Sequence, residues 1–209
     1  MKNPVRADLL VLTVILVTGL GGCGGTRKPI IPAPQSAGLF TEKRDASQPA
    51  AGMVDLIVRA SVKIPTPEHY LLESRPRPPI EGFPFELNVD GQEIVWEMRG
   101  TPEDTPVYGP QGRLPEGGEG IRYLLEKTIR LPAGPHHVVF GVPYDDYYTE
   151  VKVSLEADEP HALEFRPVYA MGRRGYRTFF HGISRTAVFL DGQDKVGKNG
   201  LLGRVRIAA

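Results

Sequence analysis

A single cysteine is the residue whose chemistry is easiest to place in this sequence. Cys23 is the only cysteine among 209 residues, and it follows Leu20, Gly21 and Gly22 at the end of an apolar run. Its thiol is a nucleophile that can be alkylated to a thioether, and the small residues before it leave the preceding peptide bond accessible. Because a lone cysteine cannot form an internal disulfide, covalent modification is the chemistry that this position favours.

The segment before Cys23 has the layout of a secretion signal. Lys2 and Arg6 precede an apolar run from Leu9 to Leu20, and small residues follow it. The run has about a dozen residues, whereas a helix needs roughly 20 to span the hydrocarbon of a bilayer. We therefore predict that residues 1–22 are a signal peptide and that the mature chain has no transmembrane helix.

Together these features resemble a bacterial lipobox. The resemblance rests on Leu20-Gly21-Gly22-Cys23. It implies a lipoprotein that carries acyl chains such as palmitate on Cys23 and is anchored by them in the bacterial cell envelope. In a Gram-negative cell the implied location is the outer membrane, facing the periplasm. The alternatives are an ordinary signal peptide with a chance cysteine, or an uncleaved membrane tether.

The composition favours a β-rich protein with an uneven charge distribution. The chain is 41% hydrophobic, which suffices for a core, and its 24 glycines and 20 prolines favour turns over helices. The formal net charge is zero, yet residues 171–209 hold eight lysines and arginines against Asp191 and Asp194. We expect a basic C-terminal β extension at residues 171–209, no cofactor, and no nucleic-acid partner.

Residues 23–52 are predicted to be a flexible tether. They show no sustained hydrophobic periodicity and contain several prolines, at positions 29, 32, 34 and 49. A coil of about 29 residues has a root-mean-square span on the order of 30 Å. Such a tether holds a folded domain, predicted at residues 53–170, clear of the membrane surface.

Alternating hydrophobicity marks the strands of this domain. Residues 54–64 are apolar at every second position, which is typical of a half-buried strand. Two further alternating runs meet at Asp90-Gly91, a dipeptide that suits a two-residue hairpin turn. This turn places Phe85 opposite Trp96, so we expect Trp96 to lie in the core, with a role as a ligand platform as the alternative.

The remaining pattern predicts a long loop and then more strands. Residues 99–120, rich in glycine and proline, are expected to form a loop of the length that is usually functional or disordered. Strands are expected at 123–131, 137–142, 148–155, 162–165, 186–190 and 203–207. The fold class is therefore all-β, as an antiparallel β-sandwich.

Part of the domain resembles a known family. The relevant segments are Leu87-Asn88-Val89-Asp90-Gly91, the turn-bearing stretch 129–138, Val151-Lys152-Val153 and Leu163-Glu164-Phe165. They look like a PEGA-type domain, an Ig-like extracytoplasmic β-sandwich module of bacterial surface proteins. The resemblance implies a non-catalytic binding or spacer module, and residues 99–120 are an insertion relative to that pattern.

Other candidate chemistry is weak. His136 and His137 are neighbours on a strand, so their side chains leave on opposite faces, and we expect surface or edge positions rather than a metal site. Asp145 and Asp146 lack the spacing of a calcium loop, which favours a hairpin turn. No metal ligands are therefore assigned, and no catalytic residues. A carboxylate pair like that of polysaccharide-cleaving enzymes stays open as the alternative.

The sequence thus leaves two function classes. The first is a lipid-anchored envelope protein whose β-sandwich module binds an envelope protein or anionic polysaccharide; the second is an enzyme acting on cell wall or polysaccharide. For the first class, the candidate partner-binding residues are Arg173, Arg174, Tyr176 and Arg177. Acidic residues in the loop 99–120 predict an acidic end and a basic end of the molecule, unless the two neutralise each other across the sheet.

Overall fold

The computed structural model describes residues 38–66, 78–157 and 159–195. The lipobox with Cys23, most of the predicted tether and the strand expected at 203–207 lie outside the described residues. Within them the chain is mostly β, and the only helical turns are two 3₁₀ segments, η2 (Pro143–Asp145) and η3 (Phe179–His181). The predicted all-β class is confirmed.

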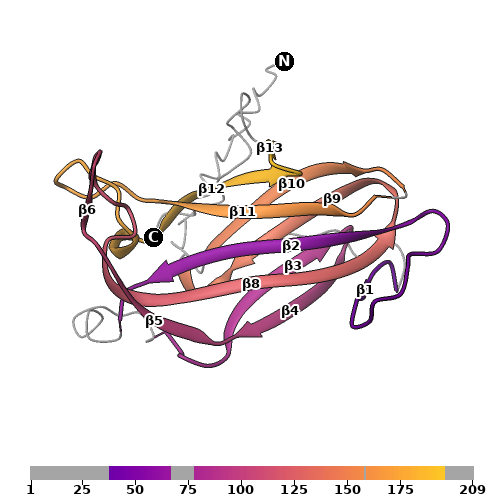
Figure 1. The fold of residues 1–209 in the computed structure, drawn as a ribbon, viewed down its shortest axis with the longest axis horizontal. Helices are drawn as coiled ribbons and strands as arrows, with labels where there is room; N and C mark the ends of the chain where they lie inside the picture. Colours follow the sequence, from indigo (N-terminus) through magenta and orange to yellow (C-terminus); the bar gives the residue numbers. More distant parts are fainter. Residues whose placement is uncertain (1–37, 67–77, 158, 196–209) are drawn as a thin grey trace, which may run out of the picture.

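The larger of two main sheets has seven strands (Figure 1). Its central strands are β8 (Gly118–Pro132), β2 (Met53–Ile64), β11 (His161–Tyr169) and β12 (Ile183–Leu190). Three short strands complete it: β1 (Thr41–Glu42) and β5 (Gly100–Thr105) pair with β8, and β13 (Gln193–Asp194) pairs with β12. Neither main sheet closes on itself, because each has two free edges.

The smaller main sheet has the strand order β10 (Tyr147–Leu155), β9 (Gly134–Val142), β3 (Phe83–Val89) and β4 (Gln92–Met98). The predicted hairpin register is confirmed, because Phe85 pairs with Trp96 and Val89 pairs with Gln92 across Asp90 and Gly91. Both turn residues have positive φ, as this turn requires. A separate two-stranded arm is formed by β6 (Tyr108–Gly109) and β7 (Gly112–Arg113).

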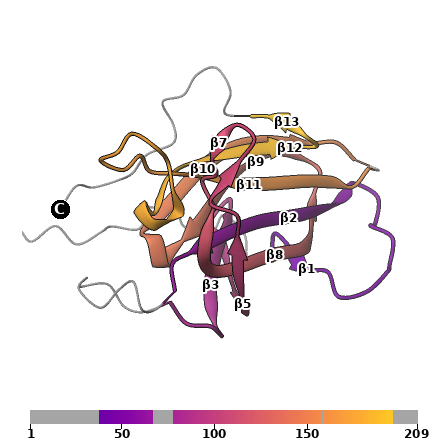
Figure 2. The same cartoon turned by 60° about the vertical axis from the view of Figure 1, so that its left-hand side comes forward.

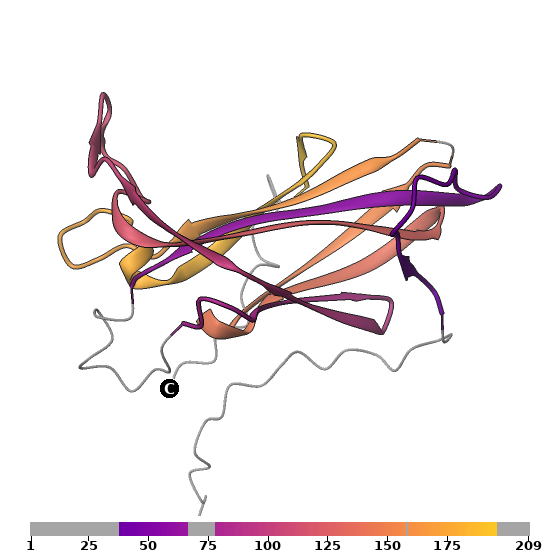
Figure 3. The same cartoon turned by 60° about the horizontal axis from the view of Figure 1, so that its bottom comes forward.

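Side chains from the two main sheets meet in one hydrophobic cluster. Figure 3 shows the sheets as two layers. Aromatic rings join them, since Phe140 of β9 stacks on Phe165 of β11 at 4.1 Å and Phe83 of β3 stacks on Tyr123 of β8 at 4.0 Å. Trp96 is 4% exposed, so it lies in the core as predicted and is no platform for a ligand.

One strand pair differs from the predicted antiparallel arrangement. β11 runs parallel to β2, with Leu56 opposite His161 and Ala60 opposite Phe165. Parallel neighbours need a long crossover connection. Here the whole smaller sheet and β8 lie between the two strands in the sequence, so local alternation carries no sign of their relative direction.

The folded part of the chain begins before residue 53, within the segment predicted to be tether. β1 pairs with β8, Phe40 is buried, and the amide side chain of Gln92 exchanges two hydrogen bonds with the Phe40 backbone at 3.0 and 2.8 Å. Lys43 also forms an ion pair with Asp55. These contacts hold residues of the segment 38–52 on the larger sheet, so this part of the predicted tether belongs to the folded domain.

The predicted loop at 99–120 is largely sheet, which corrects that prediction. β5 follows the β4 hairpin strand at once and pairs with β8 from Gly100–Tyr123 to Thr105–Gly118. Alternation of apolar and polar side chains does not mark this strand, because β5 reads Gly-Thr-Pro-Glu-Asp-Thr. The strand lies at an edge of the sheet. Proline is tolerated there because an edge strand has one unpaired side. The strand predicted at residues 186–190 is also part of this sheet: it is β12, which pairs with β11.

One of the two neighbouring histidines, His136, is buried, and its contact with Asp90 explains why. His136 was expected at the surface or an edge, but its Nδ1 lies 2.7 Å from the Asp90 carboxylate and its Nε2 lies 2.8 Å from the Pro132 carbonyl. Both ring nitrogens thus have partners away from water. His137 faces the opposite side, 3.3 Å from Glu150, as strand geometry predicts.

A second Asp-Gly turn, at Asp191 and Gly192, forms the same kind of contact with a histidine. The carboxylate of Asp191 lies 2.6 Å from His161 Nδ1 and accepts the backbone N–H of Ala162 at 2.8 Å. Asp90 likewise accepts the backbone N–H of the residue after His136. The repeated Asp-Gly-Gln sequence is therefore reused turn chemistry, in which an aspartate at a hairpin end ties that hairpin to the next strand.

The His161–Asp191 contact predicts a pH-dependent stability. Burial lowers the pKa of His161, but the hydrogen bonds with Asp191 and the Glu156 carbonyl, together with the charges of these two residues, outweigh it, so the pKa is raised above 6.5. The pKa of Asp191 is lowered from 3.8: burial opposes the shift, and the hydrogen bond to His161 causes it. A raised histidine pKa stabilises the fold fully below pH 6.5, and the effect is lost as the pH rises through the folded-state value.

The expected result is a Tm gap between the wild type and His161→Gln that is wider at about pH 5 than at about pH 8. Thermal unfolding followed by circular dichroism at both pH values measures it. A gap that is equal at both values, or wider in alkaline solution, contradicts the assigned proton linkage.

Candidate functional site

A pocket lies at the end of the molecule where the β6–β7 arm projects. It has a volume of about 470 Å³. Figure 2 turns this end forward and shows the arm above β8, together with the loop that follows β11. The arm and this loop touch, because the N–H of Phe179 donates to the Pro115 carbonyl at 3.0 Å. The lining residues are Thr105, Leu114, Pro115, Glu116, Pro167, Val168, Tyr169 and Arg177.

The pocket forms where two central strands separate. The parallel pairing of β2 and β11 ends at Ala60 and Phe165, although both strands continue. Beyond this point the hydroxyl of Tyr169 accepts the backbone N–H of Lys63 at 3.0 Å. A side chain thus replaces the backbone acceptor that a paired strand would supply, and the opening beside it is lined by the segments that lead into and out of the arm.

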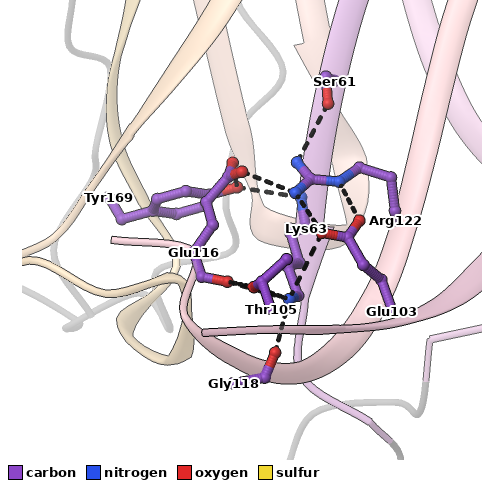
Figure 4. Close-up of polar contacts among 8 residues, drawn as sticks. All are labelled: Ser61, Lys63, Glu103, Thr105, Glu116, Gly118, Arg122 and Tyr169. Carbon is purple, nitrogen blue, oxygen red and sulfur yellow. Dashed lines mark hydrogen bonds and ion pairs between the residues drawn. The ribbon is translucent and has the colours of Figure 1, made fainter. Parts of the chain in front are cut away.

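Lys63 is the most deeply buried charged group of this region. Its side chain is 0% exposed. The ammonium donates to the hydroxyl of Thr105 at 2.8 Å and to the carbonyls of Glu116 and Gly118 at 2.9 and 2.6 Å (Figure 4). An ammonium has three N–H donors, so all are used. Each bond ties β2 to β5 or to the segment that leads from the arm into β8.

Only glycine permits this approach at position 120. A Cβ there would lie 2.8 Å from Lys63 Cε, 2.8 Å from the Ile64 carbonyl oxygen and 2.9 Å from the Phe179 ring. Such distances are far below van der Waals contact. Glycine at position 120, near the start of β8, is therefore required so that the lysine stem can pass it.

Arg122 neutralises the two carboxylates beside the lysine. Its guanidinium contacts Glu103 at 2.7 Å and Glu116 at 2.7 Å, and Glu116 also accepts the Tyr169 hydroxyl at 2.9 Å. With Lys63 and Arg122 against Glu103 and Glu116, the cluster is neutral. Paired ions of this kind hold the arm segment against the sheet.

The pKa shifts follow from this geometry. Burial lowers the pKa of Lys63, and nearby Glu103 only partly offsets that effect. Burial raises the pKa of Tyr169 well above 10, with Glu116 adding to the shift. The hydrogen bond from Arg122 lowers the pKa of Glu103. A general acid for glycoside cleavage needs a raised pKa, so Glu103 does not fit that role.

The predicted binding residues lie on the loop after β11, and one of them, Arg177, reaches this pocket. Arg177 lines it and donates one N–H to the Tyr169 carbonyl at 3.0 Å. The guanidinium of Arg113 lies over the ring of Tyr176, 4.5 Å from the ring centroid. This contact fixes the arm to the loop after β11. Arg173 and Arg174 are exposed, and neither forms an ion pair with a described residue.

The acidic and basic segments therefore lie at one end of the molecule, not at two. Glu116, from the predicted acidic end, and Arg177, from the predicted basic end, line the same pocket. The acidic residues do not neutralise the arginines of the loop, because Glu103 and Glu116 pair with Arg122 instead. The carboxylates are satisfied inside the sheet, and the arginines of the loop stay available.

Sequence reasoning missed Lys63, Arg122 and Tyr169. The alternating pattern of β2 assigned Lys63 to the solvent face, and nothing local shows that the arm covers this face at the strand end. The one available signal was Gly-Gly-Glu-Gly at 117–120, which indicates close approach of another chain segment.

Other candidate sites are not supported by geometry. Asp145 and Asp146 occupy the turn between β9 and β10, and the Asp145 carboxylate accepts the N–H of Ile183 at 3.0 Å. The hairpin-turn prediction is confirmed there. Within the described ranges, no three side chains of histidine, cysteine, aspartate or glutamate are placed to hold a metal ion.

No protein-family model matches the chain, and neither a curated protein nor a solved structure matches it. In the part of the chain that the structure describes, no helix is long and apolar enough to cross a bilayer.

Proposed function

We propose that the protein is a lipid-anchored envelope protein whose non-catalytic module docks on anionic material of the bacterial cell envelope. The anchor is the lipid on Cys23. The module is an Ig-like, PEGA-like β-sandwich, a proposal supported by two sheets that share one core and by the confirmed Asp90-Gly91 hairpin. The docking surface, called the arm end below, consists of residues 105–118 and 167–180.

The arginines of the loop after β11 carry this proposal. Arg173 and Arg174 are exposed without an ion-pair partner among the described residues, and Arg177 opens onto the pocket. Exposed, unpaired arginines attract anionic surfaces, and guanidinium groups bind phosphate and carboxylate in a bidentate manner. The attraction is screened within about 8 Å at physiological salt, so it is sensitive to ionic strength.

The anchor predicts a change in partitioning. Cys23→Ser removes the thiol, so no thioether can form, and the variant should be left unprocessed or become soluble. Phase separation in a detergent compares it with the wild type, which should enter the detergent phase as a protein of mature length. Equal partitioning of two equally processed proteins contradicts the lipoprotein proposal.

The docking surface predicts bridging between vesicles. Full-length protein anchored in phosphatidylcholine vesicles should aggregate added phosphatidylglycerol vesicles, as measured by light scattering, and salt at about 0.5 M should reverse it. Each basic residue near an anionic surface contributes on the order of 1 kcal/mol. The double variant Arg173→Glu, Arg174→Glu should therefore weaken bridging more than about tenfold. Arg177 is changed separately because it also bonds the Tyr169 carbonyl.

Arg44→Glu is the matched control, because Arg44 is an exposed arginine beside β1, away from the loop after β11. It should keep both bridging and Tm, and the double variant should keep Tm. Bridging that is insensitive to salt, or lost equally in Arg44→Glu, rejects the arm end as the docking surface.

A further inference from the structure

We infer that the pocket at the arm end takes the acyl chain of an anionic lipid whose head group binds the arginines at its rim. This inference rests on the proposed function, since it names the chemistry of the anionic material. It separates a lipid from a charged polysaccharide, which has no hydrocarbon chain to bury.

The walls of the pocket are suited to hydrocarbon. Leu114 and Pro115 line it from the arm side, and Pro167 and Val168 line it from β11. Prolines on both sides leave few backbone N–H groups to satisfy, so an apolar occupant leaves few donors without partners. The volume of about 470 Å³ falls within the range of roughly 300–1,000 Å³ that is typical of small-molecule sites.

The polar groups of the pocket divide into used and available ones. Glu116 is engaged by Arg122 and by the Tyr169 hydroxyl, so its charge is compensated. Arg177 uses one N–H for the Tyr169 carbonyl, while a guanidinium has five donors. Arg173 and Arg174 are exposed in the turn that joins Met171 to Arg177, so the loop that supplies Arg177 to the pocket attracts an anion.

Exposed apolar side chains gather around the same opening. Tyr108 on the arm is 69% exposed, Met171 is 58% exposed and Leu114 is 39% exposed. Met171 forms a β-bridge with Arg177, so the apolar and basic residues are neighbours. Apolar side chains interleaved with arginines are typical of surfaces that enter the head-group region of a membrane. Charge and apolar exposure thus point to one occupant, an anionic lipid.

Photo-cross-linking in membranes tests this inference on the full-length protein. The probe is phosphatidylglycerol with a diazirine in one acyl chain, diluted into phosphatidylcholine vesicles. Cross-links are expected in the peptides that contain Leu114–Glu116 and Pro167–Tyr169, mapped by mass spectrometry. A phosphatidylcholine probe with the same chain should label these peptides far more weakly, because it lacks the net negative charge.

Two variants block the pocket independently. Val168→Trp fills it and should lower labelling of these peptides about tenfold, because overpacking excludes the chain. Leu114→Asp places a carboxylate on an exposed wall and should have the same effect without disturbing the core. Val95→Trp is the control, since it makes the same substitution at an exposed valine on β4, in the other sheet.

The outcomes separate this inference from the proposed function. If vesicle bridging persists but neither pocket segment is labelled, the acyl-chain inference is overturned while the proposed docking surface stands. Equal labelling by the neutral probe also overturns it. Loss of both bridging and labelling in the wild type rejects the proposed function itself.

Discussion

Replacing Phe85 or Trp96 by alanine is expected to lower the free energy of unfolding by about 3–5 kcal/mol. The two residues pair across the β3–β4 hairpin, and both are buried in the cluster shared by the two sheets. Truncation leaves a cavity that surrounding side chains fill only in part. Urea denaturation followed by circular dichroism measures the loss.

Glu93→Ala is the matched control, because Glu93 is exposed on the same hairpin. It should change the free energy of unfolding by less than about 0.5 kcal/mol. If all three variants have equally small effects on the denaturation midpoint, the register and the buried face of the hairpin are wrong.

Replacing Lys63 by methionine should have a comparably large effect. Methionine fills similar space, so the loss isolates the ammonium, which bonds Thr105 and the carbonyls of Glu116 and Gly118. Removing one member of a buried ionic cluster typically costs 3–5 kcal/mol, so a loss of about that size is expected. Amide exchange should also accelerate in the arm segment, since its main attachment is lost.

Arg59→Met provides the control on the same strand. Arg59 forms an ion pair with Glu126, but both side chains are largely exposed. Exposed pairs contribute about 0–1 kcal/mol, so the variant should stay close to the wild type. A Lys63→Met variant as stable as Arg59→Met would show that the buried cluster does not hold the arm.

Local pattern predicted the parts of the fold that depend on neighbouring residues. The Asp90-Gly91 turn fixed the register of β3 and β4, and alternation located β2, β9 and β10. The parallel direction of β11 and the pairing of β5 were not predictable in this way. They depend on contacts between segments far apart in the chain, and β5 lacks the alternation that marks a strand.

The candidate site was predictable only at its rim. An excess of basic residues after residue 170 indicated Arg173, Arg174 and Arg177, because unpaired surface charge is visible in composition. The pocket and the burial of Lys63 were not visible, since they depend on the separation of β2 and β11 and on the segments beside the arm that pack there. Burial of a lysine on the polar side of a strand requires a second layer that sequence alternation does not encode.

Amide hydrogen exchange of the full-length protein tests the central claim, docking through the arm end, most directly. Exchange is compared between vesicles of phosphatidylcholine and vesicles that also contain phosphatidylglycerol. The proposal predicts slower exchange in the anionic vesicles at residues 105–118 and 167–180, with no change in the β3–β4 hairpin. Equal exchange at these segments in both membranes, or protection confined to the β3–β4 hairpin, would contradict it.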